Sequence, residues 1–417
     1  MSLSIRVRLS LMMLLEYAVW GAWAPVLYAY LVTAKPAGLG MSDPQASWIY
    51  NALPIASIIA PFLTGQLADR FFATERFMGI LHLLGGVLLI VAAGQKTFGG
   101  MMGLMLLVCL VYAPTLALTN SLAFSHMKDS DKEFGGIRVW GTIGWILSGL
   151  LLTFFRNRYP QFTPRGMTDT LYLAGIMAIL LGLLSFGLPH TPPKKEGVNP
   201  LAFLDAVNLM RDRNFLVFIL ISFVVATELQ FYYLLTAPFL EQRMGVPQAN
   251  VPGVMTTAQI AEIVVMAVLL PLLLPRMGLR KTMVVGIIAW PIRYVVFALG
   301  ASAGPSMQWL VVASLTLHGF CYVFFFTVGF MYVDKVAHAD IRASAQSLIA
   351  IVVLGLGSFF GNIITGWIAD IFKDASTKTT NWTGVFLVPC VLTVICAVLF
   401  PLLFRQTATS AEAAEGA

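Results

Sequence analysis

The stretch TGQLADRF at residues 64–71 shares five of its eight residues with TGWIADIF at residues 365–372. Each copy closes a long apolar segment, and a weaker echo, LPRMGLRK at residues 274–281, closes another. Repetition of this kind is typical of helical membrane proteins whose halves are related repeats built from inverted units. The three stretches therefore indicate a chain made of two related halves.

Composition places nearly the whole chain in a lipid bilayer. The 417 residues are 58% hydrophobic and 11% charged, with a mean hydropathy of +0.82, whereas soluble domains are roughly 45–50% apolar and about 25% charged. This excludes a water-soluble globular protein. About twelve spans of roughly 20–25 residues would use some 240–300 residues. That leaves short loops and no room for a sizeable soluble domain.

Twelve apolar segments predict twelve transmembrane helices and an all-α polytopic membrane protein. The segments are 9–31, 46–67, 76–94, 99–123, 134–155, 170–189, 215–240, 254–275, 281–300, 308–333, 343–369 and 384–404. The longest internal polar stretch divides them six from six. We therefore expect an N-terminal six-helix bundle over 1–189, a cytoplasmic linker over 190–214, a C-terminal six-helix bundle over 215–404 and a disordered cytoplasmic tail over 405–417.

Basic residues predict the orientation of these helices. With the N terminus inside, Lys and Arg in cytoplasmic loops outnumber those in external loops roughly two to one, as the positive-inside rule requires. Membrane orientation explains the formal charge of +6, so no nucleic-acid partner is expected. The 64–71 copy then closes the second helix inside, and the 365–372 copy closes the eleventh outside. We expect a multi-pass protein of the bacterial cytoplasmic (inner) membrane with both termini cytoplasmic.

The 64–71 stretch resembles the loop signature of the major facilitator superfamily. In that signature a glycine permits close helix approach, an aspartate caps a helix end and arginines anchor the cytoplasmic gate. The matching residues are Gly65, Asp69 and Arg70, with Arg76 beyond. The resemblance implies the major facilitator fold and leaves the solute open.

A few ionisable side chains lie inside the apolar segments. Such groups cost several kcal/mol at membrane depth, so each needs a partner, a water-filled cavity or a function. They are Glu16, His82, Arg138, Glu228, Glu262, Arg293 and His318. Their grouping on helical faces identifies candidates for a solute site.

Two faces carry most of this argument. Arg138, Thr142 and Trp145 follow at i, i+4 and i+7, which places a cation, a hydroxyl and an aromatic ring along one stripe suited to a polar ring compound. Gln259 and Glu262 at i, i+3 place an amide beside a carboxylate, which suits vicinal hydroxyls. The same spacing groups Gln230 with Tyr233, His318 with Tyr322, and Glu16 with Trp20 and Trp23.

Structural roles compete with several of these interpretations. Arg138 lies about one turn inside its segment, so its guanidinium can reach the cytoplasmic surface. Glu228 and Arg293 are interpreted first as structural partners. His82 has no obvious companion and is interpreted as an interfacial or packing histidine. Glu262 is hardest to explain structurally, because it lies several residues inside a span.

No catalytic or metal-binding pattern is present. The sequence has no HExxH motif, no Walker motif and no GxSxG motif with its partners. Its cysteines, Cys109, Cys321, Cys390 and Cys396, lie in apolar runs without CxxC pairing, so neither a disulfide framework nor a zinc site is indicated. We expect a protein that is not an enzyme, that has no cofactor or metal, and that uses an ion gradient or simple facilitation.

Several stretches resemble the nucleoside:proton symporter family within the major facilitator superfamily. They are WGAW at 20–23, IRVWGTIGW at 137–145, ELQ at 228–230, QIAE at 259–262 and DIRASAQ at 340–346. The resemblance implies a nucleoside site and a proton as the coupling ion. The positions it implies for that site are Arg138, Thr142, Gln230, Gln259 and Glu262, with Trp145 where the family has an aromatic residue.

The chain departs from the family pattern in two places. Val323 stands where members can carry an aspartate, and Tyr233 stands where an asparagine is expected. The first departure leaves open which group carries the proton, and the second leaves open the exact substrate. The candidates for proton coupling are Glu262 first, then His318, Glu16 and Glu228. The full predicted site is Arg138, Thr142, Trp145, Gln230, Tyr233, Gln259, Glu262, His318 and Tyr322.

We therefore expect a secondary active transporter that imports nucleosides by proton symport, through alternating access of two bundles around a midplane site. Glu262 and Gln259 would take the ribose hydroxyls, while Arg138 and Gln230 take the base edge. An aromatic ring would cover the base face, since base stacking contributes roughly 1–3 kcal/mol. The alternatives are a carrier or passive facilitator for another polar solute, such as a sugar or modified nucleoside, or a receptor. We expect the nucleoside and the bilayer as partners and a functional monomer.

Overall fold

The computed structural model describes residues 3–63, 72–127, 130–160, 167–192, 202–338, 341–377 and 379–405. Within these ranges the chain is helical apart from its loops, and the one strand-like pairing is an isolated bridge between Lys373 and Thr380. The all-α fold class expected from the sequence is confirmed.

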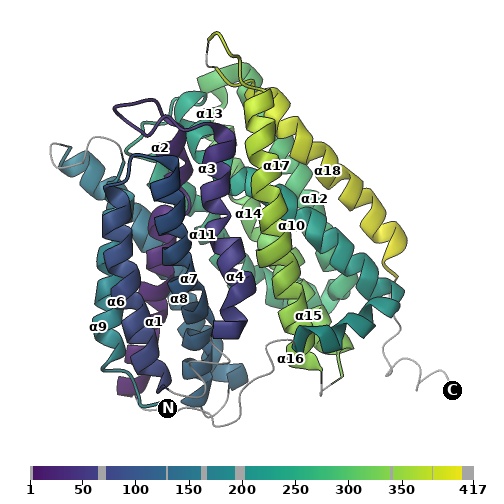
Figure 1. Cartoon of the computed structure of the whole chain (residues 1–417). Coiled ribbons are helices and arrows are strands. Elements are labelled where there is room, and N and C mark those ends of the chain that lie inside the picture. Colours follow the sequence, from purple (N-terminus) through teal and green to yellow (C-terminus); the bar gives the residue numbers. More distant parts are fainter. Residues whose placement is uncertain are drawn as a thin grey trace.

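Figure 1 shows the helices and their order. Up to residue 192 they are α1 (Leu3–Trp23), α2 (Leu27–Val32), α3 (Asp43–Tyr50), α4 (Ala52–Leu63), α6 (Thr74–Ala93), α7 (Phe98–Ser125), α8 (Ser130–Arg158) and α9 (Asp169–Ser185). From residue 202 they are the 3₁₀ helix η2 (Ala202–Arg211), α10 (Arg213–Gln242), α11 (Val251–Val264), the π-helix η3 (Val265–Leu269), α12 (Leu270–Ala303), the 3₁₀ helix η4 (Gly304–Met307), α13 (Gln308–Ser314), α14 (Leu317–Gly319), the π-helix η5 (Phe320–Thr327), α15 (Val328–Val336), α16 (Arg342–Ala350), the π-helix η6 (Ile351–Gly357), α17 (Ser358–Ile371) and α18 (Trp382–Leu403).

Eight helical stretches in the described ranges are long and apolar enough to cross a membrane. One of them, Val251–Val336, has 86 residues, which is about 130 Å at 1.5 Å per residue, whereas the hydrocarbon core is about 30 Å thick. Glycines with positive φ, Gly278 at 71° and Gly304 at 76°, break this stretch into three crossings. Together with α3–α4 and the shorter α9, the described helices overlap the apolar segments predicted from the sequence.

The helices of each half pack mainly on one another. α1 packs on α8 and α9, and α6 packs on α7 and α9. In the second half, α12 packs on α18 and η5, and α10 packs on α17 and α18. The halves meet chiefly through two helix pairs, α8 with α11 and α3 with α17. In Figure 1 the N-terminal helices stand on the left and the C-terminal helices on the right.

Two glycines allow close helix approach within this arrangement. A Cβ atom on Gly144 of α8 would meet the carbonyl oxygen of Leu14 in α1. A Cβ atom on Gly366 of α17 would meet the Ser47 side chain and the Asp43 carbonyl of α3. Neither position accepts a larger residue without a backbone shift. The IRVWGTIGW stretch and the TGWIADIF copy of the repeat thus serve helix contact.

Parts of the expected organisation lie outside the described residues. They are Gly65, Asp69 and Arg70 of the predicted gate motif, residues 193–201 of the predicted linker and residues 406–417 of the predicted tail. The domain boundaries at 189 and 214 stay predictions.

Contacts between the halves close the end of the molecule opposite the N terminus, here called the far end (Figure 1). Lys373 Nζ donates to Asp43 Oδ2 at 2.7 Å, and the Tyr28 hydroxyl donates to Asp43 Oδ1 at 3.0 Å. Between α8 and the loop before α11, Asn157 Nδ2 donates to Asn250 Oδ1 at 2.8 Å. Charged and polar pairs from both halves therefore join the two bundles at this end.

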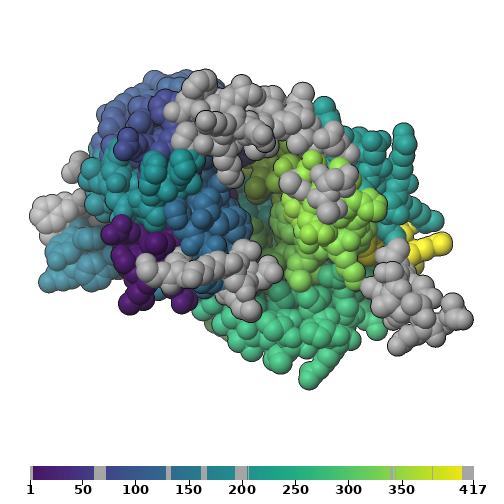
Figure 2. Space-filling view, turned by 90° about the horizontal axis from the view of Figure 1, so that it is seen from below, coloured from purple at the N-terminus to yellow at the C-terminus, as the bar shows by residue number. Residues whose placement is uncertain are grey.

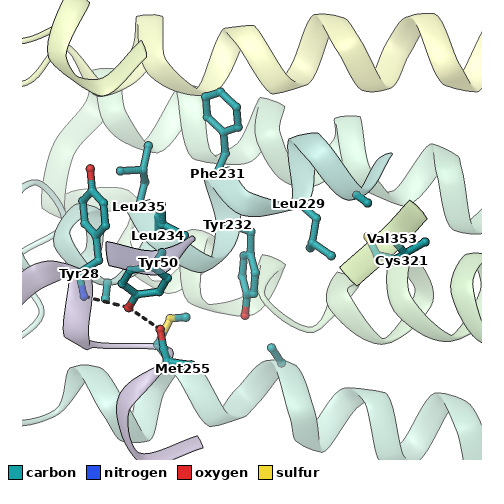
Figure 3. Packing of buried hydrophobic residues seen from close by; sticks show 14 of the residues in the cluster. Tyr28, Tyr50, Leu229, Phe231, Tyr232, Leu234, Leu235, Met255, Cys321 and Val353 are labelled. Atoms are coloured by element: carbon teal, nitrogen blue, oxygen red, sulfur yellow. Dashed lines mark hydrogen bonds between the residues drawn. The ribbon is translucent and has the colours of Figure 1, made fainter. Parts of the chain in front are cut away.

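Aromatic side chains pack next to these contacts, on the side toward the centre of the molecule. Figure 3 shows Tyr28 and Tyr50 beside Leu234 and Leu235 of α10. The Tyr50 hydroxyl accepts from the Tyr28 amide at 2.9 Å and donates to the Ala24 carbonyl at 2.7 Å. The face that carries the N terminus differs, because its described surface is hollowed between the purple-to-blue and the green elements (Figure 2).

The loop that carries Lys373 is ordered by the neighbouring Asp374. The Asp374 carboxylate accepts from the Ser376 hydroxyl, the Thr377 amide and the Ser376 amide. These bonds favour the ionised form and lower the pKa of Asp374 to about 2. The loop therefore keeps its shape across the physiological pH range and presents Lys373 to Asp43.

Asp43→Asn is expected to loosen the far end. A hydrogen bond to a charged group contributes about 1.5–3 kcal/mol, and Lys373 is 26% exposed, so we expect about a tenfold rise in the open population. The measurement is maleimide labelling of a Ser47→Cys background in detergent, because Ser47 is buried between α3 and α17.

The matched control for this variant is Asp169→Asn, which breaks an ion pair with Arg156 inside one half. It should leave the labelling rate of Ser47→Cys unchanged. Equal rates in Asp43→Asn and its parent would show that the ion pair does not hold the far end closed.

Candidate functional site

Side chains from both halves surround a cavity of about 490 Å³, here called the polar cavity. Its lining residues are Tyr17, Trp20, Arg138, Thr142, Trp145, Tyr233, Gln259, Glu262 and Tyr322. Seven of the nine residues predicted for the site lie on it, all except Gln230 and His318.

The α8 stripe faces the polar cavity as its spacing predicts. Arg138, Thr142 and Trp145 all line it. The Arg138 guanidinium lies over the Tyr17 ring of α1, with Cζ 4.1 Å from the ring centroid. This cation–π contact directs the charge toward the cavity, so the alternative in which Arg138 reaches for the cytoplasmic surface is wrong for this structure.

The α11 pair supplies acceptors to the same cavity. Gln259 is 7% exposed, and its Oε1 has no hydrogen-bond partner among the described residues. Glu262, one turn further along, is half-buried. Buried acceptors are normally satisfied, so this wall is suited to a ligand that brings hydroxyl or amine donors.

Aromatic rings form the remaining walls. Trp20 and Trp145 meet edge to face, with ring centroids 5.3 Å apart and an interplanar angle of 68°. With Tyr233 and Tyr322 they also line a second cavity of about 870 Å³, here called the apolar cavity. A planar ring system held in the polar cavity therefore has aromatic faces on which to stack.

Gln230 lies on the apolar cavity and not on the polar one. Its Nε2 donates to Ser358 Oγ at 3.2 Å. Asn362 lines the same cavity and donates from Nδ2 to Asn51 Oδ1 at 3.0 Å. Gln230 is thus separated from Arg138 by the shared aromatic rings, and only a ligand that passes between those rings could contact both residues.

His318 does not join the predicted site. It is buried in the second half, stacked on Tyr232 at 4.8 Å between centroids, with Nδ1 3.3 Å from Arg293 Nη1. The Arg293 guanidinium lies over Tyr232 at 4.3 Å and Trp290 at 5.0 Å. His318 lines neither cavity, but its ring packs on two residues that line both, Tyr322 at 5.7 Å and Tyr233 at 6.1 Å between centroids.

Glu228 and Arg293 do not form the direct pair that their structural interpretation suggests. Neither carboxylate oxygen of Glu228 has a hydrogen-bond partner among the described residues, and the same holds for Arg293 Nε and Nη2. The Tyr294 hydroxyl donates to the backbone carbonyl of Glu228 at 3.0 Å. The two charges therefore share a buried region of the second half without an ion pair.

Two further positions matter for proton coupling. Glu16 lies behind the polar cavity, and its neighbour Tyr17 lines that cavity. Val323 is fully buried in the apolar core beside Tyr322. An apolar residue therefore suits the surroundings of Val323, and the proton must bind elsewhere.

Tyr17 was missed as a site residue by sequence reasoning, and Trp20 was grouped only with Glu16. Their i, i+3 spacing places both on one face of α1. This shared face is the sequence signal that indicates both residues. Ser358 and Asn362 of the apolar cavity were likewise missed, because α17 shows no charged residue at that level.

Comparison with known proteins separates this chain from other carriers of similar architecture. The nucleoside H⁺ symporter family matches residues 1–409. The chain belongs to the nucleoside H⁺ symporter family.

Relatives of this nucleoside H⁺ symporter cover almost its whole length. The putative nucleoside transporter YegT of Escherichia coli (strain K12) is 37% identical over 96% of this chain and 94% of its own. The xanthosine permease of the same organism is 28% identical over 95% of each chain. The crystal structure of the nucleoside transporter NupG matches with a TM-score of 0.84 at 26% identity, covering 97% of this chain and 100% of that one. The expected major facilitator fold is confirmed, and the protein is a transporter and not an enzyme.

Proposed function

We propose that this nucleoside H⁺ symporter imports nucleosides together with protons by alternating access of its two bundles. The observation that carries the proposal is the polar cavity, where the Arg138 cation, the Gln259 and Glu262 acceptors and five aromatic side chains meet. A base edge, a ribose and a base face need these three kinds of group.

Ribose recognition is assigned to α11. The two ribose hydroxyls are donors on adjacent carbons. Gln259 and Glu262 present acceptors at adjacent turns of one face of α11. Hydrogen bonds to a charged acceptor contribute about 1.5–3 kcal/mol each. The unpartnered Gln259 Oε1 supports this assignment.

Base recognition is assigned to the α8 stripe and the aromatic walls. Arg138 can donate to a carbonyl oxygen or ring nitrogen at the base edge. Stacking against Trp145 or Trp20 adds roughly 1–3 kcal/mol. Gln230 contacts only a base that extends into the apolar cavity, so it acts as a selector for base size.

The closed far end and the hollowed N-terminal face support an inward-facing state. With both termini cytoplasmic, the polar cavity would communicate with the cytoplasm, and rocking at the α3–α17 and α8–α11 contacts would open the far end. The monomer is proposed as the working unit in the bacterial inner membrane.

The coupling ion in this proposal is the proton, and no cofactor or metal is required. The four candidate proton-binding groups lie in different parts of the molecule. Glu262 lies in the polar cavity, His318 and Glu228 are buried in the second half, and Glu16 is buried in the first half.

Uptake by purified protein in liposomes tests the function. With an inward proton gradient, labelled uridine or adenosine should accumulate above its outside concentration, and a protonophore should abolish the accumulation. Without a gradient the solute should only equilibrate. Protein-free liposomes are the control for leakage.

Three outcomes would redirect the proposal. Equilibration that ignores the proton gradient would favour a passive facilitator. Failure of both nucleosides to accumulate or to compete would favour another polar solute, such as a sugar or modified nucleoside, to which Tyr233 and the apolar cavity would then be adapted. Saturable binding without flux would indicate a receptor.

A further inference from the structure

A carboxylate and an imidazole are buried together inside the first half. Glu16 on α1 is 0% exposed and His82 on α6 is 2% exposed. Glu16 Oε2 lies 2.8 Å from His82 Nε2. The interpretation of His82 as a packing residue without a companion is therefore wrong.

Among the described residues, the other polar contacts of this pair come from α7. The Thr115 hydroxyl donates to Glu16 Oε1 at 2.7 Å, and the Tyr112 hydroxyl donates to the Glu16 carbonyl at 2.8 Å. The Tyr112 ring meets the His82 ring edge to face at 6.2 Å. Both carboxylate oxygens of Glu16 thus have hydrogen-bond partners, and these partners can stabilise a negative charge on the carboxylate.

The remaining titratable neighbours are few. They are Tyr17 on α1, Cys109 and Tyr112 on α7, Arg138 on α8 and Glu262 on α11. Arg138 acts electrostatically on both tyrosines, and Glu262 acts on Tyr17. Residues 173–185 of α9, which packs on α1, contain no titratable side chain. Glu16 and His82 are the acid and the base that lie in direct contact in the described part of this region.

That proton changes the net charge of the pair. With a neutral imidazole the pair carries one negative charge, and with an added proton it becomes a carboxylate–imidazolium pair with no net charge. A buried net charge is costly and a neutral pair much less so. Proton binding is reversible, and the proton comes from water and returns to water.

Glu16 is adjacent in sequence to a residue that lines the polar cavity. Tyr17 follows Glu16 in α1 and lies under the Arg138 guanidinium at 4.1 Å. Gly141 allows this closeness, because a Cβ there would lie 2.7 Å from both Arg138 Nη1 and the Tyr17 ring. Arg138 is therefore held next to the element whose charge the proton changes.

His82 is close to the space between the halves. His82 and Trp23 both line a small pocket in the first half. Trp23 also lines the apolar cavity between the halves. Trp23 therefore contributes to the linings of both spaces.

We propose that the Glu16–His82 pair binds the transported proton and sets the position of Arg138, an inference that rests on the proposed function. Without the proton, the negative pair attracts Arg138 toward α1 and away from the solute. With the proton, that attraction ends and Arg138 is free to bind the base. Proton binding therefore precedes tight nucleoside binding.

The test compares Glu16→Gln and His82→Gln with the parent protein in liposomes. Both variants should exchange labelled uridine for internal unlabelled uridine, because exchange needs no net proton movement. Both should lose gradient-driven accumulation, with the inside-to-outside ratio falling to about one. In detergent, uridine should bind the parent more tightly at pH 6 than at pH 8, and this difference should vanish in Glu16→Gln.

Glu75→Gln is the matched control. Glu75 lies on α6, as His82 does, and is also a buried acid paired with a histidine. Its Oε1 lies 2.9 Å from Nδ1 of His190. It lines none of the cavities described above, so this variant should keep both accumulation and the pH dependence of binding. If the Glu16–His82 pair were purely structural, Glu16→Gln would lower the melting temperature as Glu75→Gln does. It would then leave the pH dependence of uridine binding intact.

Each outcome decides between the two proposals. Accumulation by Glu16→Gln or His82→Gln at the parent level overturns this inference and leaves the proposed function standing. Absence of accumulation by the parent overturns the proposed function. If Glu16→Gln is not monodisperse in detergent, His82→Gln decides alone, and parent-like accumulation by it assigns the proton to another group.

Discussion

Glu262→Gln should abolish concentrative nucleoside uptake. The substitution keeps the size of the side chain but removes the negative charge from the wall that faces the solute. Loss of a charge-assisted hydrogen bond costs about 1.5–3 kcal/mol, so nucleoside affinity should fall roughly 10- to 100-fold. Weak binding of this size leaves the cavity mostly empty at working solute concentrations, and accumulation against a gradient stops.

Equilibrium binding of labelled uridine and uptake into liposomes measure the two effects separately. Glu241→Gln is the matched control, because Glu241 is an acid in the last turn of α10 that accepts from Gln248 at 3.3 Å and does not line the polar cavity. Undiminished gradient-driven accumulation in Glu262→Gln would remove Glu262 from both solute binding and proton coupling.

Arg138→Ala should weaken nucleoside binding by a similar factor. The substitution removes the one cation on the polar cavity and leaves the Tyr17 ring without its cation–π partner. A charged donor at the base edge contributes about 1.5–3 kcal/mol, which corresponds to roughly a 10- to 100-fold rise in Kd. Arg138→Lys should recover only part of the affinity, because an ammonium cannot make a planar two-point contact.

Arg158→Ala provides the control on the same helix. Arg158 lies in the last turn of α8, near the ring of Tyr159 at 5.3 Å, and does not line the cavity. It should bind uridine as the parent does. Unchanged affinity in Arg138→Ala would assign the guanidinium to packing on Tyr17 and reopen the identity of the group that reads the base.

These two variants also separate binding from coupling when compared with Glu16→Gln. Glu262→Gln and Arg138→Ala should impair exchange as well as accumulation, since both reduce occupancy of the cavity. Glu16→Gln should impair accumulation alone. The ratio of exchange to accumulation therefore distinguishes a residue that holds the solute from one that holds the proton.

The sequence by itself determined the membrane-spanning class, the positions of the helices and the shared faces on them. Apolar length marks a span because unpaired backbone groups cannot face lipid. Helical periodicity fixes which residues share a face, and this is why Arg138, Thr142 and Trp145 were predicted together correctly. The pair Gln259 and Glu262 follows from the same local rule.

Only the tertiary structure decided which faces meet. Glu16 and His82 are 66 residues apart, and no local pattern relates them. His318 and Tyr322 share a face by spacing, yet His318 turns toward Arg293 while Tyr322 lines the polar cavity. Periodicity is a property of one helix, whereas the rotation of that helix against its neighbours depends on long-range packing such as the Gly144 contact with Leu14. The site is therefore assembled from locally predictable faces whose partners are chosen by packing between helices.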